Sequence, residues 1–196
     1  GFSSSWDFAS NWTVGQAPGI PHDVFIDPET SLTVSGPSTD VTVRSLTVGG
    51  GAGLGTLSLR GGVLRASEGI EIAPTGVLTG DGTVAGTVTN RGEVQARNVV
   101  VAAGQLVNEG RIRGASEGPD RIDGAIRNAT DGRIEVLAGE GLRLGGGTLT
   151  NEGRVRVLEG RLAVDGPFVN AADGRVQARD ALLEFEGGLA NAGEVL

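Results

Sequence analysis

The sequence has no cysteine, methionine, tyrosine or lysine and only one histidine, and each of these gaps removes a class of protein chemistry. Without cysteine there can be no disulfide, thiolate metal site or cysteine nucleophile. One histidine excludes a multi-histidine metal centre, and we predict no metal and no cofactor. No apolar run approaches the ~18 residues of a membrane-spanning helix, so we expect no membrane insertion by this segment. The net charge of −8 argues against nucleic acid as a partner.

Glycine is abundant, at 35 of 196 residues, and it marks an internal repeat. Only 7 prolines accompany it without a Gly-X-Y period, which excludes collagen. A segment that begins with asparagine and reaches a glycine two or four residues later occurs six times. Its asparagines, six of the eight in the chain, are Asn90, Asn108, Asn128, Asn151, Asn170 and Asn191. Its glycines, spaced by 18, 22, 21, 21 and 19 residues, are Gly92, Gly110, Gly132, Gly153, Gly174 and Gly193.

Between these corners the chain alternates apolar and polar residues, as in Arg133-Ile-Glu-Val136 and Arg154-Val-Arg-Val157. A period of two is typical of strands with one buried face, and no window shows a helical stripe or the leucine lattice of leucine-rich repeats. The sequence therefore predicts an all-β fold, a right-handed parallel β-helix (β-solenoid) with about 18–22 residues and three short strands per coil. Eight or nine coils at ~4.8 Å each make a rod ~40 Å long. One inward column is predicted to contain Val94, Ile112, Ile134, Val155, Val176 and Val195.

The asparagine and the glycine of each corner have separate predicted roles. We expect the glycine to take a positive φ where the chain turns sharply. We expect the asparagine side chain to bond to its own turn and to the asparagine of the next coil, which would form a ladder. Upstream of residue 90 the coils are less regular, and the glycines of Gly61-Gly62 and Gly80-Asp-Gly82 are predicted to separate short strands by turns.

The first 30 residues differ in composition from the rest, which divides the chain into an N-terminal cap over residues 1–30 and a β-helix over residues 31–196. Five of the seven aromatic residues lie here, and three prolines interrupt regular structure. A solenoid has to cover its open end, because exposed strand edges invite aggregation. The aromatic side chains expected to plug the first coil are Phe2, Trp6, Phe8, Trp12 and Phe25.

Two stretches carry a resemblance to known proteins. Trp6-Asp-Phe-Ala-Ser-Asn-Trp-Thr-Val-Gly-Gln-Ala-Pro18, followed by Asp23-Val-Phe-Ile26, resembles the opening of bacterial surface β-helix proteins. The stretch from Gly76 to Gly92 is similar to repeats of autotransporter passenger domains and of large secreted proteins of the exosortase-sorted type. The resemblance implies a β-helix that serves as a stalk, adhesin or matrix component.

An arginine stripe is the most distinctive candidate binding feature. After the corner glycine, successive coils place Arg111, Arg133, Arg154 and Arg175 in register. Stacked like charges repel one another unless they are paired or bind an anion. This face could therefore dock an anionic glycan or a neighbouring acidic subunit. The carboxylates available for such a subunit contact are Glu140, Glu159, Asp165, Asp180, Glu184 and Glu186. The alternative is a solvated face on which Glu109, Glu135 and Glu152 screen the arginines.

An enzymatic reading has little support from the residues present. Enzymes on parallel β-helices need clustered carboxylates, and the best spot here is the Asp120 and Asp123 pair in the least regular repeat. A plain surface loop is the simpler interpretation, and His22 beside Asp23 is expected to make a cap hydrogen bond. No Ser-His-Asp set can be assembled, so we predict no catalytic residues.

The predicted function is that of a structural, non-enzymatic protein, a β-solenoid component of a bacterial surface or extracellular fibre. The last residues still lie within a repeat, so we expect either more chain or another copy over the final coil, and the second case would give end-to-end self-assembly. The alternatives are an adhesin segment that binds glycans along one face and a polysaccharide-active enzyme. The partners expected are other copies of the chain or cell-surface polymers, outside the cell.

Overall fold

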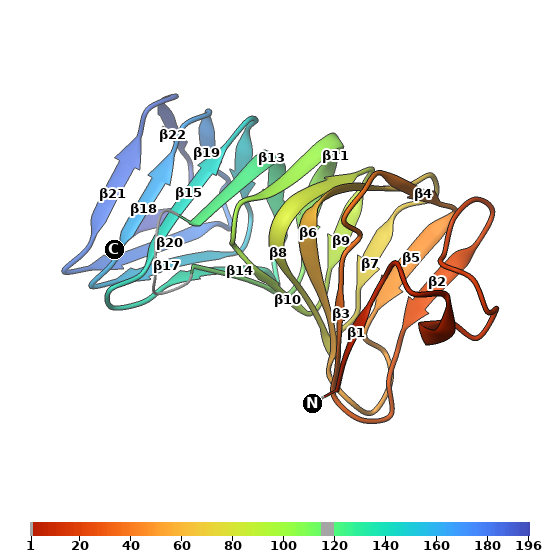
Figure 1. Cartoon of the computed structure of the whole chain (residues 1–196). Helices are drawn as coiled ribbons and strands as arrows, with labels where there is room; N and C mark the ends of the chain where they lie inside the picture. Colours follow the sequence, from red (N-terminus) through yellow and green to blue (C-terminus); the bar gives the residue numbers. More distant parts are fainter. Residues whose placement is uncertain (1, 115–119) are drawn as a thin grey trace.

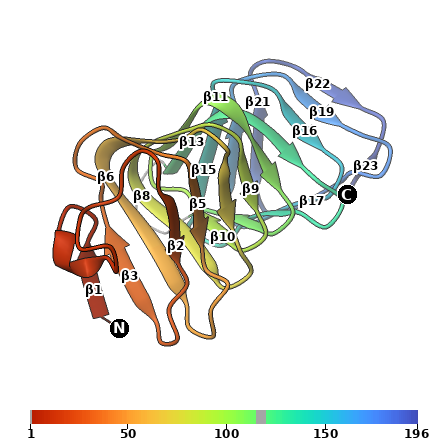
Figure 2. The ribbon, with the colours of Figure 1, turned by 90° about the vertical axis from the view of Figure 1, so that its right-hand side faces the viewer.

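The computed structural model describes residues 2–114 and 120–196, and it confirms the predicted parallel β-solenoid. Parallel strands stack in about eight turns, with essentially no helix. The N-terminal strands lie at one end of the stack and the C-terminal strands at the other (Figures 1 and 2). Three ladders of backbone hydrogen bonds run along the stack, so each coil is bonded to the coils before and after it.

The first sheet contains the strand that follows each corner glycine. Its members pair in parallel from one coil to the next. They are β1 (Phe2–Ser5), β3 (Leu32–Ser35), the starts of β6 (Gly55–Ala66) and β8 (Gly76–Ala85), β10 (Glu93–Gln95), β12 (Arg111–Arg113), β14 (Arg133–Val136), β17 (Arg154–Leu158), β20 (Arg175–Arg179) and β23 (Glu194–Val195).

The second and third sheets complete each coil. The second contains β4 (Val41–Val43), the ends of β6 and β8, the starts of β11 (Val99–Asn108) and β13 (Asp120–Asn128), β15 (Gly141–Gly145), β18 (Arg161–Val164) and β21 (Leu182–Phe185). The third contains β2 (Asp23–Ile26), β5 (Ser45–Val48), β7 (Ile70–Ile72), β9 (Val88–Asn90), the ends of β11 and β13, β16 (Leu149–Asn151), β19 (Phe168–Asn170) and β22 (Leu189–Asn191).

The upstream glycines do not end strands, contrary to the prediction. β6 continues through Gly61 and β8 through Gly80, and each strand bends from the first sheet into the second. Both glycines have a positive φ, 83° and 98°, and the pairing of β6 with β8 shifts register after Arg60. A glycine can bend a strand without ending it, because its backbone reaches this conformation at little cost.

The core is a set of apolar columns that follow the alternation in the sequence. In β17 the pattern Arg154-Val-Arg-Val157 places the arginines outside and the valines inside. The column predicted from the repeat is buried, at 0–2 % exposure, from Val94 to Val176. Val195 departs from it, with 50 % exposure, because β23 is the last rung of the first sheet in the structure.

Residues 2–26 supply strands to the first coil as well as the connection between them. β1 pairs with β3 and β2 pairs with β5, so both ladders start within the segment predicted to be a cap. The connection holds the one short 3₁₀-helix of the described chain, η1 (Ala9–Asn11). In the part of the chain that the structure describes, no helix is long and apolar enough to cross a membrane.

Candidate functional site

The six corner asparagines form one continuous hydrogen-bonded column on the third sheet. Each Nδ2 donates to the Oδ1 of the asparagine in the next coil, at 2.6 Å from Asn90 to Asn108 and 2.7 Å at each later step to Asn191. Each Nδ2 from Asn90 to Asn170 also donates to the carbonyl that follows the next corner glycine, at 2.9–3.4 Å. The first five asparagines are fully buried, so the column ties each coil to its neighbour inside the molecule.

The two ends of this column differ. Asn90 follows Ile72 in the ladder, and its Oδ1 is buried without a partner among the described residues. Val48 and Ile26 occupy the same position in the coils before Ile72. The column therefore changes from apolar to amide at Asn90, and at its other end Asn191 is exposed.

The corner glycines are required for a reason other than the one predicted. None of the six has a positive φ. A Cβ at Gly153 would overlap the carbonyl oxygens of Ala129 and Gly132, and one at Gly92 would overlap those of Ala73 and Gly76. The other four corners show the same overlap with the backbone of the preceding coil. Glycine is needed because the backbones of successive coils pass too close for any side chain.

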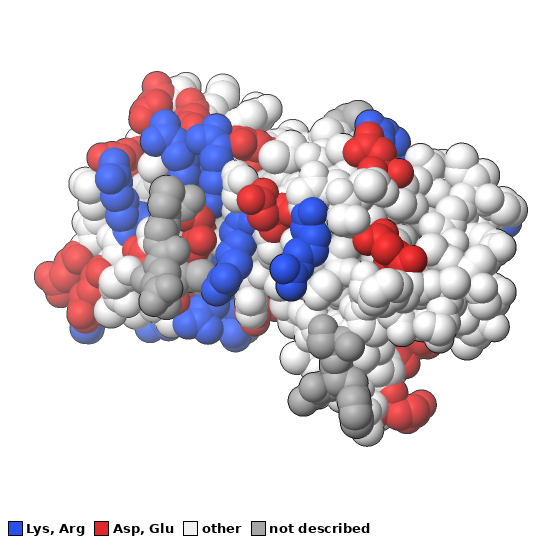
Figure 3. All heavy atoms as spheres, in the orientation of Figure 1, with Lys and Arg blue, Asp and Glu red and all other residues white. Residues whose placement is uncertain are grey.

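The predicted arginine stripe lies on the outer face of the first sheet. Arg111, Arg133, Arg154 and Arg175 are in register on β12, β14, β17 and β20. In the view of Figure 3, arginine and carboxylate side chains gather over the C-terminal coils, whereas much of the N-terminal half is uncharged. A second row lies two residues further along each strand and contains Gln95, Arg113, Glu135, Arg156 and Gln177.

The ends of the stripe are paired with carboxylates and its middle is not. Arg111 lies 3.2 Å from Glu135, and Arg175 lies 3.5 Å from Glu194. Arg133 and Arg154 have no carboxylate within ion-pair distance in the described part of the chain. The same holds, among the described residues, for Arg156 in the second row, two residues beyond Arg154 on β17.

The carboxylates predicted to screen the stripe contact other arginines in most cases. Glu109 lies 2.9 Å from Arg91, and Glu152 lies 2.6 Å from Arg127. Only Glu135 contacts a member of the stripe, Arg111. The predicted screening is therefore wrong for Arg133 and Arg154, since register alone does not show which long side chains meet.

Arg113 has a partner that no local sequence signal indicates. Its guanidinium donates to Oε1 of Glu140 at 2.9 Å, across 27 residues of sequence. The side chain of Glu140 is 5 % exposed, and its Oε2 accepts the N–H of Leu137 at 2.9 Å. The hydrogen bond and charge of Glu140 raise the pKa of Arg113 above its ordinary value. Arg113 is therefore paired within the chain. In the second row, Arg156 is the arginine that has no carboxylate partner among the described residues.

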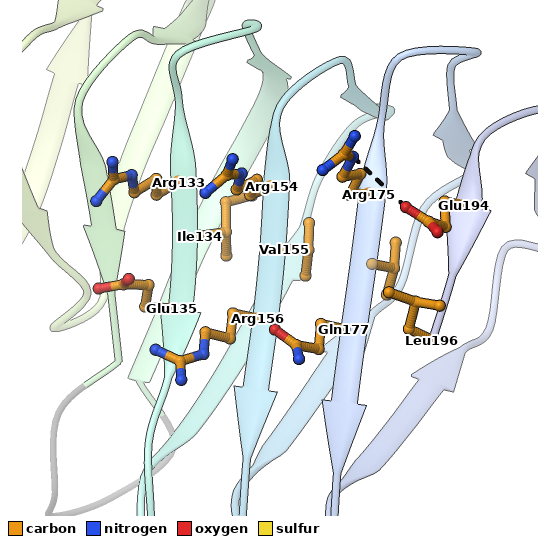
Figure 4. Close-up of a pocket in the computed structure, with 11 residues that line it drawn as sticks. Arg133, Ile134, Glu135, Arg154, Val155, Arg156, Arg175, Gln177, Glu194 and Leu196 are labelled. Carbon is orange, nitrogen blue, oxygen red and sulfur yellow. Dashed lines mark ion pairs between the residues drawn. The ribbon is translucent and has the colours of Figure 1, made fainter.

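The free arginines line a shallow groove of about 360 Å³ on the first sheet. Figure 4 shows Arg133, Arg154 and Arg175 in one row along neighbouring strands, with Arg156 and Gln177 in the row beside them. The lining also includes Glu135, Glu194 and Leu196. All four of these arginines are exposed, and the donors of the three without a carboxylate partner among the described residues, Arg133, Arg154 and Arg156, are available to an anion in solution.

The two aspartates singled out as an enzyme-like pair do not converge. Residues 115–119 of that repeat lie outside the described residues, and both aspartates lie on β13. Asp120 is buried on the same side of the strand as Ile122, whereas Asp123 lies on the outer side and accepts from Arg121 at 2.5 Å. Because an acid–base pair has to reach one substrate bond, side chains on opposite faces of a strand cannot form it.

The carboxylates predicted for a contact with another subunit are already paired with arginines of the same chain. Six carboxylates lie 2.6–3.9 Å from arginine nitrogens. They are Glu140, Glu159, Asp165, Asp180, Glu184 and Glu186. Within the described ranges, no group of three or more histidine, aspartate or glutamate side chains could hold a metal ion.

The N-terminal aromatic residues divide into buried and exposed ones. Trp6 is fully buried and meets Trp12 edge-on, with ring centroids 5.1 Å apart, and the Trp12 Nε1–H donates to the Trp6 carbonyl at 2.8 Å. Phe8 and Phe25 are 66 % and 58 % exposed, so neither plugs the coil. Phe25 points outward because its neighbours in β2 take the inward positions. The side chain of Phe2 lies outside the described part of the structure.

His22 makes a local contact, as its position suggested. Its Nδ1 accepts the N–H of Gly19 at 3.0 Å, and its Nε2 lies 3.2 Å from the amide nitrogen of Gln16. Asp23 pairs with Arg44 in the next coil of the third sheet. His22 therefore makes its contacts within the loop before β2 and stabilises that loop.

The comparison with known protein families finds a match over part of these coils. A family model described as the BigA fourth domain matches residues 55–157, which is 103 of the 196 residues. The chain belongs to the BigA fourth-domain family. Neither a curated protein nor a solved structure matches it. BigA is a bacterial surface protein, which agrees with the bacterial surface β-helix type that the sequence resembles. The match does not single out autotransporter passenger domains or exosortase-sorted proteins.

The BigA match places much of the candidate site within the family domain. It extends from β6 into β17 and includes four members of the asparagine column, Asn90 to Asn151. Three arginines of the stripe and Arg156 also lie within the match, and Arg175 lies beyond it.

Proposed function

We propose that this BigA-family chain is a rigid, non-enzymatic structural segment of a bacterial surface protein that stands outside the cell. The observation that carries this proposal is the buried asparagine column together with the three backbone ladders that run beside it. Bending the stack would lengthen hydrogen bonds in at least one sheet and in the column. The coils are therefore expected to move as one body about 40 Å long.

Small-angle X-ray scattering of the purified chain tests the rigidity. We expect the maximum dimension to remain unchanged as salt or mild urea is raised, until the cooperative unfolding transition. A maximum dimension that grows gradually before that transition would contradict a stiff rod. Antibodies against the purified chain should label intact cells of the source bacterium, and labelling only after lysis would contradict a surface location.

An assay for polysaccharide breakdown tests the non-enzymatic part of the proposal. Incubation with carboxylated, sulfated and neutral polysaccharides is expected to release no reducing ends and no unsaturated products. Product formation that is lost in Asp123→Asn would overturn a purely structural role, because it would assign a catalytic carboxylate to β13.

Electron microscopy distinguishes single rods from filaments of copies joined end to end. In an in-register stack, β22 of one copy would face β2 of the next, and Asn191 would meet Ile26. That contact would bury the Asn191 amide against an apolar side chain and interrupt the column. We therefore expect dispersed rods at low micromolar concentration. Filaments with an axial repeat near the length of one molecule would instead support self-assembly.

A further inference from the structure

We propose that the groove around Arg133, Arg154 and Arg156 binds a linear anionic polysaccharide that lies along the solenoid axis. The inference is independent of the rod role, since a rod could stand on the cell surface with or without this ligand. These three arginines share the property that they lack a carboxylate partner among the described residues. Of the 16 arginines, only five have no carboxylate within ion-pair distance among the described residues. The other two, Arg60 and Arg97, lie away from the groove.

The register of the strands sets the direction of the ligand. Arg133 and Arg154 are paired positions on neighbouring strands, and Arg156 lies two residues beyond Arg154 on the same outer face. Arg133 and Arg154 are therefore one coil, ~4.8 Å, apart along the axis, whereas Arg156 lies beside Arg154 in the same coil. Three like charges this close repel one another in the free protein, and an anion between them relieves that repulsion. A polymer with negative groups along its length can meet successive coils at once.

The chemistry of the lining favours an acidic sugar chain. Guanidinium groups bind carboxylate and sulfate through paired N–H donors. The exposed amide of Gln177 is in register with Arg156 and can exchange hydrogen bonds with hydroxyl groups. Leu196 adds an apolar contact at the same groove. The two carboxylates of the lining, Glu135 and Glu194, are paired with Arg111 and Arg175, and the remaining cation, amide and apolar surface matches a polymer that carries acid groups, hydroxyls and C–H faces.

Two other occupants fit less well. A second copy would have to supply carboxylates, and the six predicted for such a contact already lie 2.6–3.9 Å from arginines of their own chain. Single-stranded nucleic acid is usually held by aromatic side chains that stack on its bases, and no aromatic residue lines the groove.

The test measures binding of defined probes to the purified chain by isothermal titration calorimetry at low salt. The probes are a polygalacturonate oligosaccharide, a heparin oligosaccharide, a dextran of similar length and a thymidine oligonucleotide. We expect at least one acidic oligosaccharide to bind more tightly than dextran and the oligonucleotide, with affinity that falls as salt is added. Which acidic probe binds more tightly separates carboxylate from sulfate recognition.

A matched pair of double variants assigns the site. Arg154→Gln combined with Arg156→Gln should weaken binding by about tenfold or more, since two charge-assisted contacts are removed. Arg60→Gln combined with Arg97→Gln changes the net charge equally and also removes two unpaired arginines. This control should stay within about twofold of the parent chain. Circular dichroism and thermal unfolding check that both variants remain folded.

Several results would overturn the proposal. Equal weakening in both double variants would mean attraction by net charge rather than a site. Acidic oligosaccharides that bind no better than dextran would remove the ligand class, and tighter binding of the oligonucleotide would reassign the groove to nucleic acid. A dimer of the parent chain that is lost only in the groove variant would identify a second copy as the occupant.

Discussion

Replacing Asn128 by alanine should remove the central link of the buried asparagine column and destabilise the whole solenoid. Asn128 is fully buried and joins the column in both directions. Its Oδ1 accepts from Asn108 at 2.7 Å, and its Nδ2 donates to Asn151 Oδ1 at 2.7 Å and to the Arg154 carbonyl at 3.2 Å. It also donates to the Gly132 carbonyl at 3.3 Å, which keeps the Arg154 N–H as a donor when Asn128 is replaced.

The size of the loss follows from the groups that Asn128→Ala leaves without partners. The Oδ1 of Asn151 would be a buried acceptor with no donor, which costs about 1–3 kcal/mol. Asn108 would lose one of two acceptors and the Arg154 carbonyl one donor, at about 0.5–1.5 kcal/mol each. Together these effects lower the free energy of unfolding by roughly 2–6 kcal/mol, where the total for a protein is only about 5–15 kcal/mol. For a chain of this length the loss corresponds to a fall in Tm of roughly 4–24 °C.

Urea unfolding followed by two probes measures the effect and shows where it occurs. Both tryptophans, Trp6 and Trp12, lie in the first coil, so their fluorescence reports on that end. Circular dichroism reports on all strands. If the column couples the coils, the two signals should change together and at lower urea in Asn128→Ala than in the parent chain.

Two variants separate the hydrogen bonds from other effects. Asn128→Asp keeps the size of the side chain, but a carboxylate cannot donate to Asn151, so it should destabilise at neutral pH at least as much as alanine does. Asn191→Ala removes the exposed last member of the column and should cost less than about 0.5 kcal/mol, since water can replace it. The reasoning is refuted if Asn128→Ala costs no more than Asn191→Ala.

Three further changes test other parts of the structure by the same unfolding measurement. Asn90→Ile extends the apolar part of the column by one coil, moves the unpartnered acceptor to Asn108 and removes one donor from the Arg111 carbonyl, so it should cost about 0.5–1.5 kcal/mol, and a loss as large as that of a central asparagine would contradict this. Gly153→Ala places a Cβ against two carbonyl oxygens and should cost about 3 kcal/mol or more, whereas Gly19→Ala, with open space around it, should be nearly neutral. Arg113→Gln removes the cation from buried Glu140 and should cost about 1–3 kcal/mol. Because the pKa of Arg113 is raised, its contribution is complete below the ordinary arginine pKa and is lost only in strong alkali. The cost should therefore be constant between about pH 7 and pH 9, and a cost that disappears in this range would contradict the assignment.

The fold was predictable from the sequence because every coil of a solenoid has to meet the same local requirement. Each coil has to place an apolar residue inside and a polar residue outside on every strand, so alternation, period and corner residues appear directly in the chain. The register of Asn90 to Asn191 and of Arg111 to Arg175 follows from the same period, because equal positions in successive coils stack. The asparagine column was foreseen on this basis alone.

Features that depend on distances across coils were decided only by the tertiary structure. The corner glycines were expected to need a positive φ, but the close approach of the preceding coil's backbone is what requires them. Phe25 was expected to plug the first coil, and its place in β2 directs it outward. The glycine contact is not visible in a single repeat, because it joins the backbones of two coils.

The positions of the arginines were also predictable from the sequence, whereas their carboxylate partners were not. The sequence by itself determined that four arginines stack on one face, since strand register depends on backbone spacing. Only the tertiary structure decided that Arg111 and Arg175 have carboxylate partners while Arg133 and Arg154 do not. Long side chains reach across coils and choose among several neighbours, and the choice depends on how all the packed coils place their carboxylates. The free cations of the groove are therefore a property of the assembled solenoid rather than of any one repeat.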